Sequence, residues 1–361
     1  MTAPLRWPDS PSVAPRIPFT VIGGFLGAGK TTLVNWVLAQ TANRRVAILV
    51  NDFGNLAIDA ALVSQQSATT ISLTNGCVCC SLVGGLAQAL LDVLHLDPAP
   101  DHIVVEASGV SDPRRIAQIA RADSSFMPDA TIVLMAADQL LALTCDRYVG
   151  DTVLAQVAAA DFLILNKLDL VSAEETDAIR ARLATLAPHA RLIETVNAQV
   201  PCDVVLGHTA DRIQHLAGSP ISRRPIATPG GVATRVPLQA DAQDHEGRFS
   251  THTFRCREPV SGLLLRRALD ALPAAVLRAK GIIRIDDAPE AQHLIQAVGS
   301  RWSLSPFAAR DTLEASALVI IGSTEALAEA DLTPIAAAFR SAPPSISRQR
   351  MGRRVLQWGV R

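Results

Sequence analysis

The sequence lacks an excess of charge of either sign, and it lacks an apolar segment long enough to cross a membrane. Its 361 residues include 33 Lys and Arg against 34 Asp and Glu, so no global field attracts nucleic acid or an anionic membrane. No apolar run reaches the roughly 18 residues that a membrane span needs. Residues 1–18 are rich in proline and contain no signal-peptide core. We therefore expect a cytoplasmic protein that binds neither nucleic acid nor membrane.

Cysteine is also scarce, which argues against a disulfide framework. Only six cysteines occur, and half of them are crowded together as Cys77, Cys79 and Cys80. Clustering of this kind favours metal or redox chemistry in a reducing compartment. The other cysteines are scattered, and we expect them to be small core residues. They are Cys145, Cys202 and Cys256.

Short β-branched runs alternate with longer helical segments from residue 18 to about 205. This alternation is typical of a mostly parallel sheet with crossover helices, so the predicted fold class is α/β. Several of the runs are apolar throughout, as strands buried on both faces should be. The predicted strands are Phe19–Ile22, Val46–Val50, Thr70–Leu73, Ile103–Glu106, Thr131–Met135, Phe162–Leu165 and Leu192–Thr195.

A stretch rich in Pro, Gly, Arg and Ser ends this alternation, and residues 218–247 are predicted to be a linker. Beyond it, strands and helices follow one another without strict βαβ order, which favours a smaller α+β domain at residues 248–361. Residues 1–17 are expected to be a flexible N-terminal segment. The predicted C-terminal elements are the strands Phe249–Cys256, Ile282–Ile285 and Ala317–Ile321 and the helices Ser261–Ala271 and Leu332–Arg340.

A glycine-rich loop, GGFLGAGKTT at residues 23–32, follows the first strand and opens a helix, which is the context of a phosphate-binding loop. Backbone N–H groups and the positive end of the helix bind phosphate oxygens in such loops. Lys30 is expected to reach the β- and γ-phosphates, and the Thr31 hydroxyl to bind Mg²⁺. A structural turn is the alternative, but the full pattern seldom arises by chance. The predicted nucleotide-binding residues here are Gly24, Gly27, Ala28, Gly29, Lys30, Thr31 and Thr32.

Asn166-Lys167-Leu168-Asp169 directly follows a predicted strand and indicates which base is bound. In P-loop GTPases this pattern recognises guanine, because the Asp carboxylate accepts from the ring N–H and the exocyclic amine while Lys lies along the base. Adenine would present an acceptor to the same carboxylate. A helix N-cap at Asp169 is the alternative. Beyond a phosphate-binding loop, the pattern favours guanine and assigns Asn166, Lys167 and Asp169 to it.

Glu106-Ala107-Ser108-Gly109 closes another predicted strand. A carboxylate at the end of a buried strand can hold Mg²⁺ through water or orient the attacking water, and a glycine N–H can meet the γ-phosphate. Lys30, Glu106 and Gly109 are therefore the predicted catalytic residues. The alternative for Glu106 is capping of the helix that begins near Asp112.

Asn75-Gly76 predicts a turn, which places Cys77, Cys79 and Cys80 on a loop after a strand. Three thiolates can converge on one soft cation and leave a tetrahedral position open, which suits transfer better than permanent binding. The alternatives are a redox pair and inert buried cysteines. The paired Cys-x-x-Cys motifs of a structural zinc ribbon are absent.

With these motifs, the chain resembles the family of P-loop GTPases that includes the CobW proteins, relatives of the hydrogenase and urease nickel-insertion GTPases. The resemblance covers nearly the whole chain and implies a P-loop GTPase domain at residues 18–217 and a CobW C-terminal domain at 248–361. Its marks are residues 23–32, 75–81, 106–109, Asp112-Pro113, 166–169, Leu277-Arg278-Ala279-Lys280-Gly281 and Val298-Gly299-Ser300-Arg301-Trp302.

The resemblance implies a GTP-dependent metallochaperone. Mg²⁺ and GTP are its expected cofactors, Zn²⁺ or Co²⁺ its cargo, and a metal-receiving client protein its partner. Hydrolysis is expected to be slow and to respond to the metal. A nucleotide-gated metal sensor and a P-loop phosphotransferase are the competing interpretations.

Two departures from the family pattern bear on the metal site. Asp52 and Asn55 stand where the family often has two glutamates, so one carboxylate is lost; Asp52 and Thr31 remain candidate ligands for Mg²⁺ or the transition metal. The family's His-rich stretch is reduced to His245 and His252, which argues against metal storage.

Overall fold

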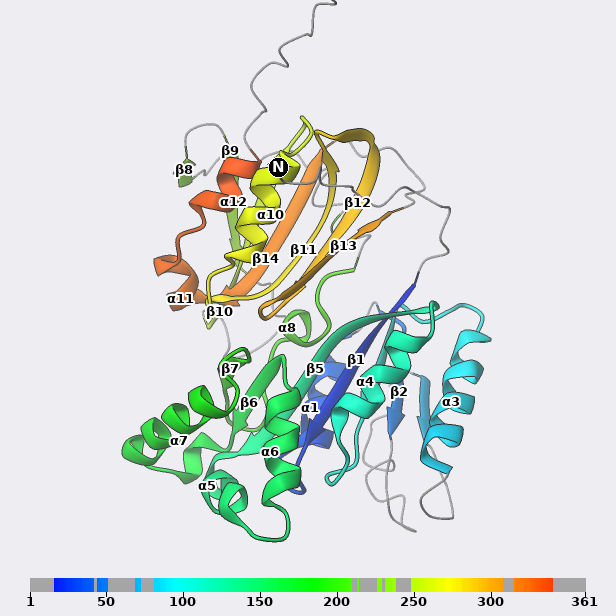
Figure 1. Cartoon of the computed structure of the whole chain (residues 1–361), viewed down its shortest axis with the longest axis vertical. Coiled ribbons are helices and arrows are strands. Elements are labelled where there is room, and N and C mark those ends of the chain that lie inside the picture. The colour runs from blue at the N-terminus through cyan, green and yellow to red at the C-terminus, as the bar shows by residue number, and fades with distance from the viewer. Residues whose placement is uncertain are drawn as a thin grey trace, which may run out of the picture.

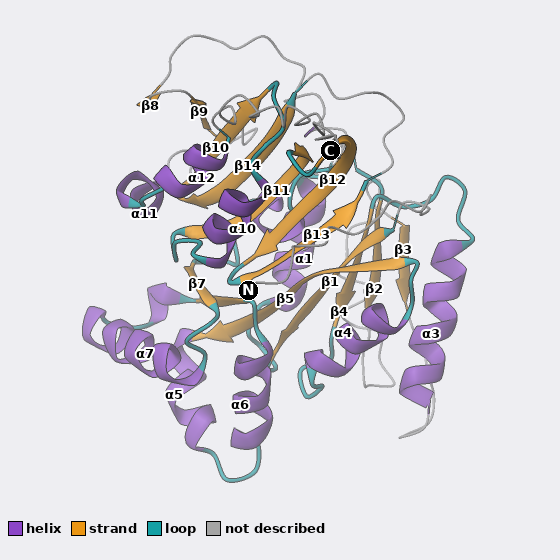
Figure 2. Ribbon diagram, turned by 45° about the horizontal axis from the view of Figure 1, so that its top comes forward, coloured by secondary structure: helices purple, strands orange, loops and turns teal. Residues whose placement is uncertain are grey.

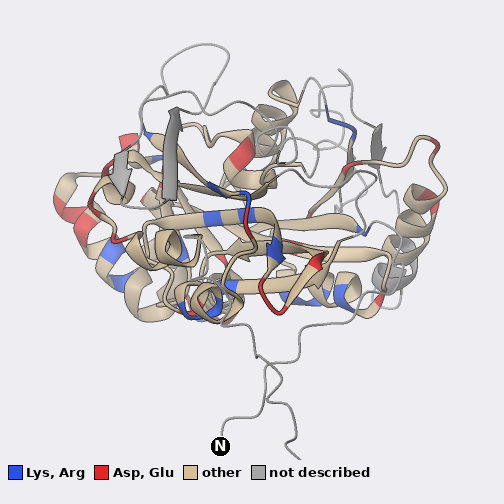
Figure 3. Ribbon diagram, turned by 90° about the horizontal axis from the view of Figure 1, so that it is seen from above, with Lys and Arg blue, Asp and Glu red and all other residues tan. Residues whose placement is uncertain are grey.

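Two seven-stranded sheets, one parallel and one antiparallel, organise the described part of the chain (Figure 1). The computed structural model describes residues 16–41, 44–50, 69–72, 81–209, 213, 226–228, 231–237, 248–307 and 315–339. Acidic and basic residues are interspersed along the ribbon rather than separated by sign (Figure 3). Within the described ranges, no helix is long and apolar enough to cross a membrane.

The first sheet has the strand order β3-β2-β4-β1-β5-β6-β7, and every pairing between neighbours is parallel. Parallel pairing requires long crossovers, and helices supply them wherever the structure describes the connecting residues. The strands are β1 (Ile17–Gly24), β2 (Val46–Val50), β3 (Thr69–Ser72), β4 (His102–Glu106), β5 (Phe126–Ala136), β6 (Phe162–Asn166) and β7 (Arg191–Glu194).

Helices cover both faces of this sheet because alternate strand residues point to opposite sides (Figure 2). Ile22 packs with α1 and α8 on one face, whereas its neighbour Val21 packs with α3 and α4 on the other. Helices α5, α6 and α7 continue the second face. The helices are α1 (Lys30–Ala39), α3 (Ser81–Leu94), α4 (Pro113–Ala122), α5 (Ala137–Cys145), α6 (Gly150–Ala159), α7 (Ala173–Leu186) and α8 (Cys202–Leu206).

The second sheet has the order β13-β12-β11-β14-β10-β9-β8, with antiparallel pairing throughout. Helices α10 and α12 pack on one face, and residues of the other face, including Leu277 and Ile321, join the core of the first sheet. The elements are β8 (Ile226–Thr228), β9 (Gly231–Pro237), β10 (Phe249–Cys256), α10 (Gly262–Asp270), β11 (Val276–Ile285), β12 (Ala288–Val298), β13 (Arg301–Pro306), β14 (Ser316–Ser323), α11 (Thr324–Glu329) and α12 (Thr333–Ala338).

The predicted fold class is confirmed, and every predicted strand is present, although β5 and β11 begin five and six residues earlier than predicted, at Phe126 and Val276. Strands β12 and β13 were not predicted, because polar residues interrupt their apolar pattern. Strands β8 and β9 fall within residues 218–247, the expected linker, where Gly231 pairs with Thr228 and β9 pairs with β10. Such short strands near a sheet edge carry little periodicity in the sequence.

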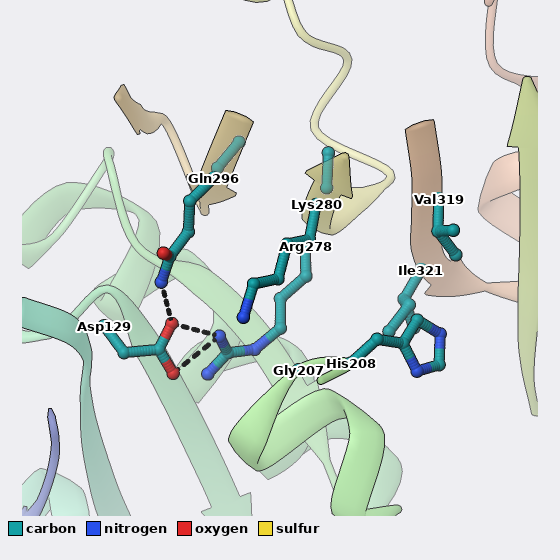
Figure 4. Close-up of a pocket in the computed structure, with 10 residues that line it drawn as sticks. Asp129, Gly207, His208, Arg278, Lys280, Gln296, Val319 and Ile321 are labelled. Atoms are coloured by element: carbon teal, nitrogen blue, oxygen red, sulfur yellow. Dashed lines mark hydrogen bonds and ion pairs between the residues drawn. The ribbon is translucent and has the colours of Figure 1, made fainter. Parts of the chain in front are cut away.

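A buried carboxylate joins the two sheets at the amino ends of the parallel strands (Figure 4). Asp129 on β5 is 4% exposed and accepts from Arg278 Nη1 at 2.8 Å (Oδ1) and 2.9 Å (Oδ2). Gln296 Nε2 donates to it at 2.5 Å and Thr20 Oγ1 at 3.0 Å. Burial alone would raise the pKa of Asp129, but the charge and hydrogen bond of Arg278, together with smaller contributions from His102 and Lys280, hold this pKa below its usual value. The second sheet thus contributes the positive charge that offsets the free-energy cost of burying this carboxylate.

Further bonds from the second sheet hold the same end of the first. Arg278 also donates to the Val204 and Val205 carbonyls of α8, each at 2.5 Å. Arg301 on β13 pairs with Asp161 beside β6, with its Nε 2.6 Å from Oδ1. These contacts lie at the amino end of the first sheet, and Arg248, directly before β10, adds one at the carboxyl end of β7, where its Nη2 donates to the Glu194 carbonyl at 2.8 Å.

Replacing Asp129 by Asn should destabilise the protein strongly. The change leaves the buried Arg278 guanidinium without its counter-charge, which costs about 3–5 kcal/mol. The matched control is Asp177→Asn, which removes a solvent-exposed partner of Arg180 and should cost at most about 1 kcal/mol. Urea unfolding followed by circular dichroism measures both, and similar midpoints for the two variants would contradict the prediction.

The neighbouring His102 should make stability fall in mild acid. Its Nε2 lies 2.8 Å from Thr20 Oγ1, and burial lowers the pKa of His102 from 6.5 to about 3, with Asp129 opposing and Arg278 adding to the decrease. The unfolded chain takes up the proton near pH 6.5 while the folded state stays neutral, so stability is lost as pH falls below 6.5. Between pH 7 and pH 5 the loss is about 2 kcal/mol. His102→Gln should remove this part of the pH dependence, and an equal loss in both proteins would refute its assignment to His102.

Candidate nucleotide-binding site

The glycine-rich loop joins β1 to α1 through left-handed backbone. Gly24 and Gly29 have φ values of +132° and +102°, which side-chain-bearing residues rarely adopt. A Cβ on Gly24 would lie 2.3 Å from the Leu134 carbonyl oxygen, and one on Gly29 would lie 2.5 Å from Asn166 Nδ2. At Gly27 a Cβ would meet no atom within 4 Å, so this part of the loop is open. The loop therefore needs glycine for its shape and leaves room beside Gly27.

Lys30 and Thr31 begin α1 and face the loop and β4. Lys30 is buried, and its Nζ donates to the Phe25 carbonyl at 3.2 Å, across the loop. Thr31 Oγ1 donates to Glu106 Oε1 at 2.9 Å. A hydroxyl and a carboxylate form an oxygen-only donor set, which fits Mg²⁺ rather than a soft metal. Thr31 and Glu106, which were both predicted to act at Mg²⁺, therefore lie in direct contact.

The alternative role for Glu106 is not observed. Glu106 is the buried last residue of β4, and the N-cap of α4 is Asp112, whose Oδ1 accepts from Arg114 N at 3.0 Å. Gly109 packs against the glycine-rich loop, since a Cβ there would lie 2.5 Å from Leu26 Cδ2. The segment after β4 therefore adjoins the phosphate-binding loop.

Asn166 connects the guanine motif to that loop. Its Nδ2 donates to the Ala28 carbonyl at 3.0 Å, and its Oδ1 accepts from Ala198 N at 2.8 Å. Lys167 follows in the left-handed region (φ +64°), and Asp169 is exposed. The cap of α7 is Ser172, so Asp169 does not cap that helix. The N-cap alternative for Asp169 is thus not observed.

Sequence reasoning missed two residues around these loops. Ala198 has positive φ (+54°), as does its neighbour Asn197 (+56°), and Ala198 N–H meets Asn166. Gln156 contacts the segment after β4. Neither residue belongs to a sequence motif, so only its position in the fold shows that it contacts these loops. Of the residues predicted to bind nucleotide, Thr32 has an exposed side chain.

The predicted metal ligands Cys77, Cys79, Cys80 and Asp52 lie outside the described residues. The strand before the cysteines, β3, ends at Ser72, and α3 begins at Ser81. Ser72 pairs with Val50, which also pairs with Glu106, so β3 and β4 end at the same level of the sheet. Within the described ranges, no cluster of three or more His, Cys, Asp or Glu could hold a metal ion.

The three scattered cysteines have different environments. Cys202 is buried, as predicted, and burial raises the pKa of the half-buried Cys256 thiol to about 12. Cys145 is exposed at the end of α5, so its prediction as a core residue was wrong. An apolar sequence neighbourhood did not reveal that this helix end faces solvent.

A glycine-rich loop between a parallel strand and a helix, with lysine and threonine at the helix start, defines a P-loop nucleotide-binding protein. Residues 18–194 match the family model for the CobW/HypB/UreG nucleotide-binding domain, and residues 249–337 match the model for the cobalamin synthesis protein cobW C-terminal domain. The chain belongs to the CobW/HypB/UreG family and carries the CobW C-terminal domain. The resemblance inferred from the motifs is confirmed.

Curated relatives include several proteins named for zinc. The zinc chaperone CobW of Sinorhizobium sp is 26% identical over 79% of this chain and 86% of its own length. The zinc chaperone CobW of Pseudomonas aeruginosa is 29% identical over 57% of this chain, and the match spans 63% of that relative's own length. Among solved structures, the Zn(II)-bound YjiA GTPase from E. coli is 21% identical with a TM-score of 0.41, covering 90% of this chain and 98% of its own.

Asn166→Ala should weaken nucleotide binding by about tenfold to a hundredfold, because the buried Ala28 carbonyl and Ala198 N–H both lose their partner and the loop loses its support. Titration with fluorescent GDP measures the effect. The control, Gln88→Ala, removes an amide that donates to Asp92 on the exposed side of α3, and this variant should bind GDP as the parent does. Equal affinities for all three proteins would exclude a role for Asn166.

Proposed function

We propose that this protein is a GTP-hydrolysing metallochaperone that delivers a divalent transition metal, Zn²⁺ in the first instance, to a client protein. The observation that carries the proposal is the shared edge of the parallel sheet, where Gly24, Glu106 and Asn166 end their strands and Ser72 leads into the cysteine segment. Nucleotide and metal would therefore act on neighbouring loops of one rigid sheet.

The nucleotide end of the proposal assigns a role to each side chain. Lys30 would bind the β- and γ-phosphates, and the 2.9 Å pair of Thr31 and Glu106 would receive Mg²⁺, which supplies charge neutralisation on the phosphates when bound. Glu106 would also orient water, and the Gly109 N–H would meet the γ-phosphate. Asn166, Lys167 and Asp169 would select guanine, which the family's GTPases bind.

The metal end of the proposal rests on thiolate chemistry. Cys77, Cys79 and Cys80 would take Zn²⁺ as cargo, since thiolates prefer soft and borderline cations and three of them leave a position open for transfer. The names of the CobW relatives support zinc. Co²⁺ is the second candidate, because thiolate sites accept both ions and cells select by availability. Asp52 is a candidate additional ligand.

The nucleotide site and the metal site would be coupled because both lie on loops that follow strands of the same sheet. If γ-phosphate and metal stabilise the same arrangement of loops, GTP tightens metal binding and metal tightens GTP binding by the same factor. Hydrolysis removes the γ-phosphate contacts, which weakens metal binding and permits delivery.

Cys79→Ser tests this coupling. In the parent, Zn²⁺ should tighten binding of a GTP analogue about fivefold or more and change the rate of hydrolysis. The variant should lose both responses and keep its metal-free GDP affinity. Cys145→Ser, at an exposed thiol on α5, is the matched control and should respond as the parent does. Equal Zn²⁺ responses in Cys79→Ser and the parent would contradict the proposal.

Transfer separates delivery from sensing. After GTP hydrolysis, the parent loaded with Zn²⁺ should activate an apo-metalloenzyme faster than the same amount of protein held in a GTP analogue. Retention of the ion after hydrolysis would indicate a sensor instead. Phosphorylation of an acceptor other than water would indicate a phosphotransferase.

A further inference from the structure

One buried amide anchors the segment that follows β4. Gln156 on α6 is 0% exposed, and its Nε2 donates to the Gly109 carbonyl at 3.1 Å and to the Ser111 carbonyl at 2.9 Å. A carboxamide nitrogen carries two hydrogens, so this one side chain uses both on a single loop. The loop between β4 and α4 is therefore tied at two points to a helix that crosses from β5 to β6.

The helix that provides this anchor is firmly held. Val153 and Val157 of α6 are both 0% exposed and pack in the core with residues of β5 and β6. The chain enters α6 through a turn in which Asp146 Oδ1 accepts from Tyr148 N at 2.7 Å and Val149 N at 3.0 Å. A shift of Gln156 would thus require a shift of well-packed core.

The other side of the same loop touches the phosphate-binding loop. A Cβ on Gly109 would lie 2.5 Å from Leu26 Cδ2 and 3.0 Å from Leu26 N. Within the loop, Ser111 N donates to the Ser108 carbonyl at 3.0 Å and closes a turn. Gly109 is therefore confined between Leu26 and Gln156, and a displacement of about an ångström would change its distance to anything bound by the phosphate-binding loop.

We propose that Gln156 is a positioning residue for GTP hydrolysis, which sets the place of Gly109 relative to the γ-phosphate. This inference rests on the proposed function. GDP has no γ-phosphate, so its binding does not depend on Gly109. Loss of the Gln156 anchor should therefore act on the discrimination between GTP and GDP and on turnover, but not on binding of the diphosphate.

Two variants test this role. Gln156→Met keeps the length of the side chain and removes both donors, and Gln156→Glu keeps the shape and turns acceptors toward the two carbonyls. In each, the affinity for a non-hydrolysable GTP analogue relative to GDP should fall about tenfold, and kcat should fall by a similar factor. Affinity for GDP alone should stay within about threefold of the parent. The matched control, Gln88→Met, removes an amide on α3 that donates to Asp92 and should keep the parent's ratio.

The outcomes separate this inference from the proposed function. Variants that keep both the affinity ratio and kcat of an active parent would overturn the positioning role alone. A similar loss in Gln88→Met would also overturn it, since loss of an amide that does not contact the loop would then suffice. A parent that neither binds guanine nucleotide nor hydrolyses GTP would overturn the proposed function, and the inference with it.

Discussion

The parallel direction of the first sheet is the constraint on which the rest of the structure depends. Because all neighbouring strands run the same way, their carboxyl ends meet at one edge, and each is followed by a loop that must cross to a helix. Gly24, Glu106 and Asn166 are the last residues of their strands and so converge there. Ser72, the last residue of β3, lies at the same edge and precedes the three clustered cysteines in the sequence. Chemistry at one edge thus follows from strand direction rather than from any single contact.

The amino ends of the parallel strands contact the second sheet. A buried carboxylate such as Asp129 is costly unless it is paired and hydrogen-bonded, and Arg278 and Gln296 from β11 and β12 meet that need. Arg278 also donates hydrogen bonds to the Val204 and Val205 carbonyls of α8. These contacts make the position of the second sheet relative to the first specific.

Buried amides give the loops at the nucleotide edge their shape. Asn166 holds the Ala28 carbonyl and the Ala198 N–H, and Gln156 holds the carbonyls of Gly109 and Ser111. An amide suits this purpose because it carries no charge to desolvate and satisfies backbone groups that would otherwise be buried without partners. Neutral contacts therefore set the geometry around a site whose ligands are highly charged.

The sequence by itself determined the fold class, the family and the phosphate-binding loop, because apolar strand runs and the GGFLGAGKTT pattern are local signals. It also indicated Glu106 and Asn166 through their places after strands. It did not reveal β12, β13, the pairing of β8 and β9, the exposure of Cys145, or the roles of Gln156 and Asp129. The contacts of Gln156 and Asp129 join residues that lie far apart in the chain, since Gln156 meets Gly109 across 47 positions and Arg278 meets Asp129 across 149. Only the packed tertiary structure decides such contacts, since it brings the two partners together and buries them, and an unpaired polar group costs free energy only when it is buried.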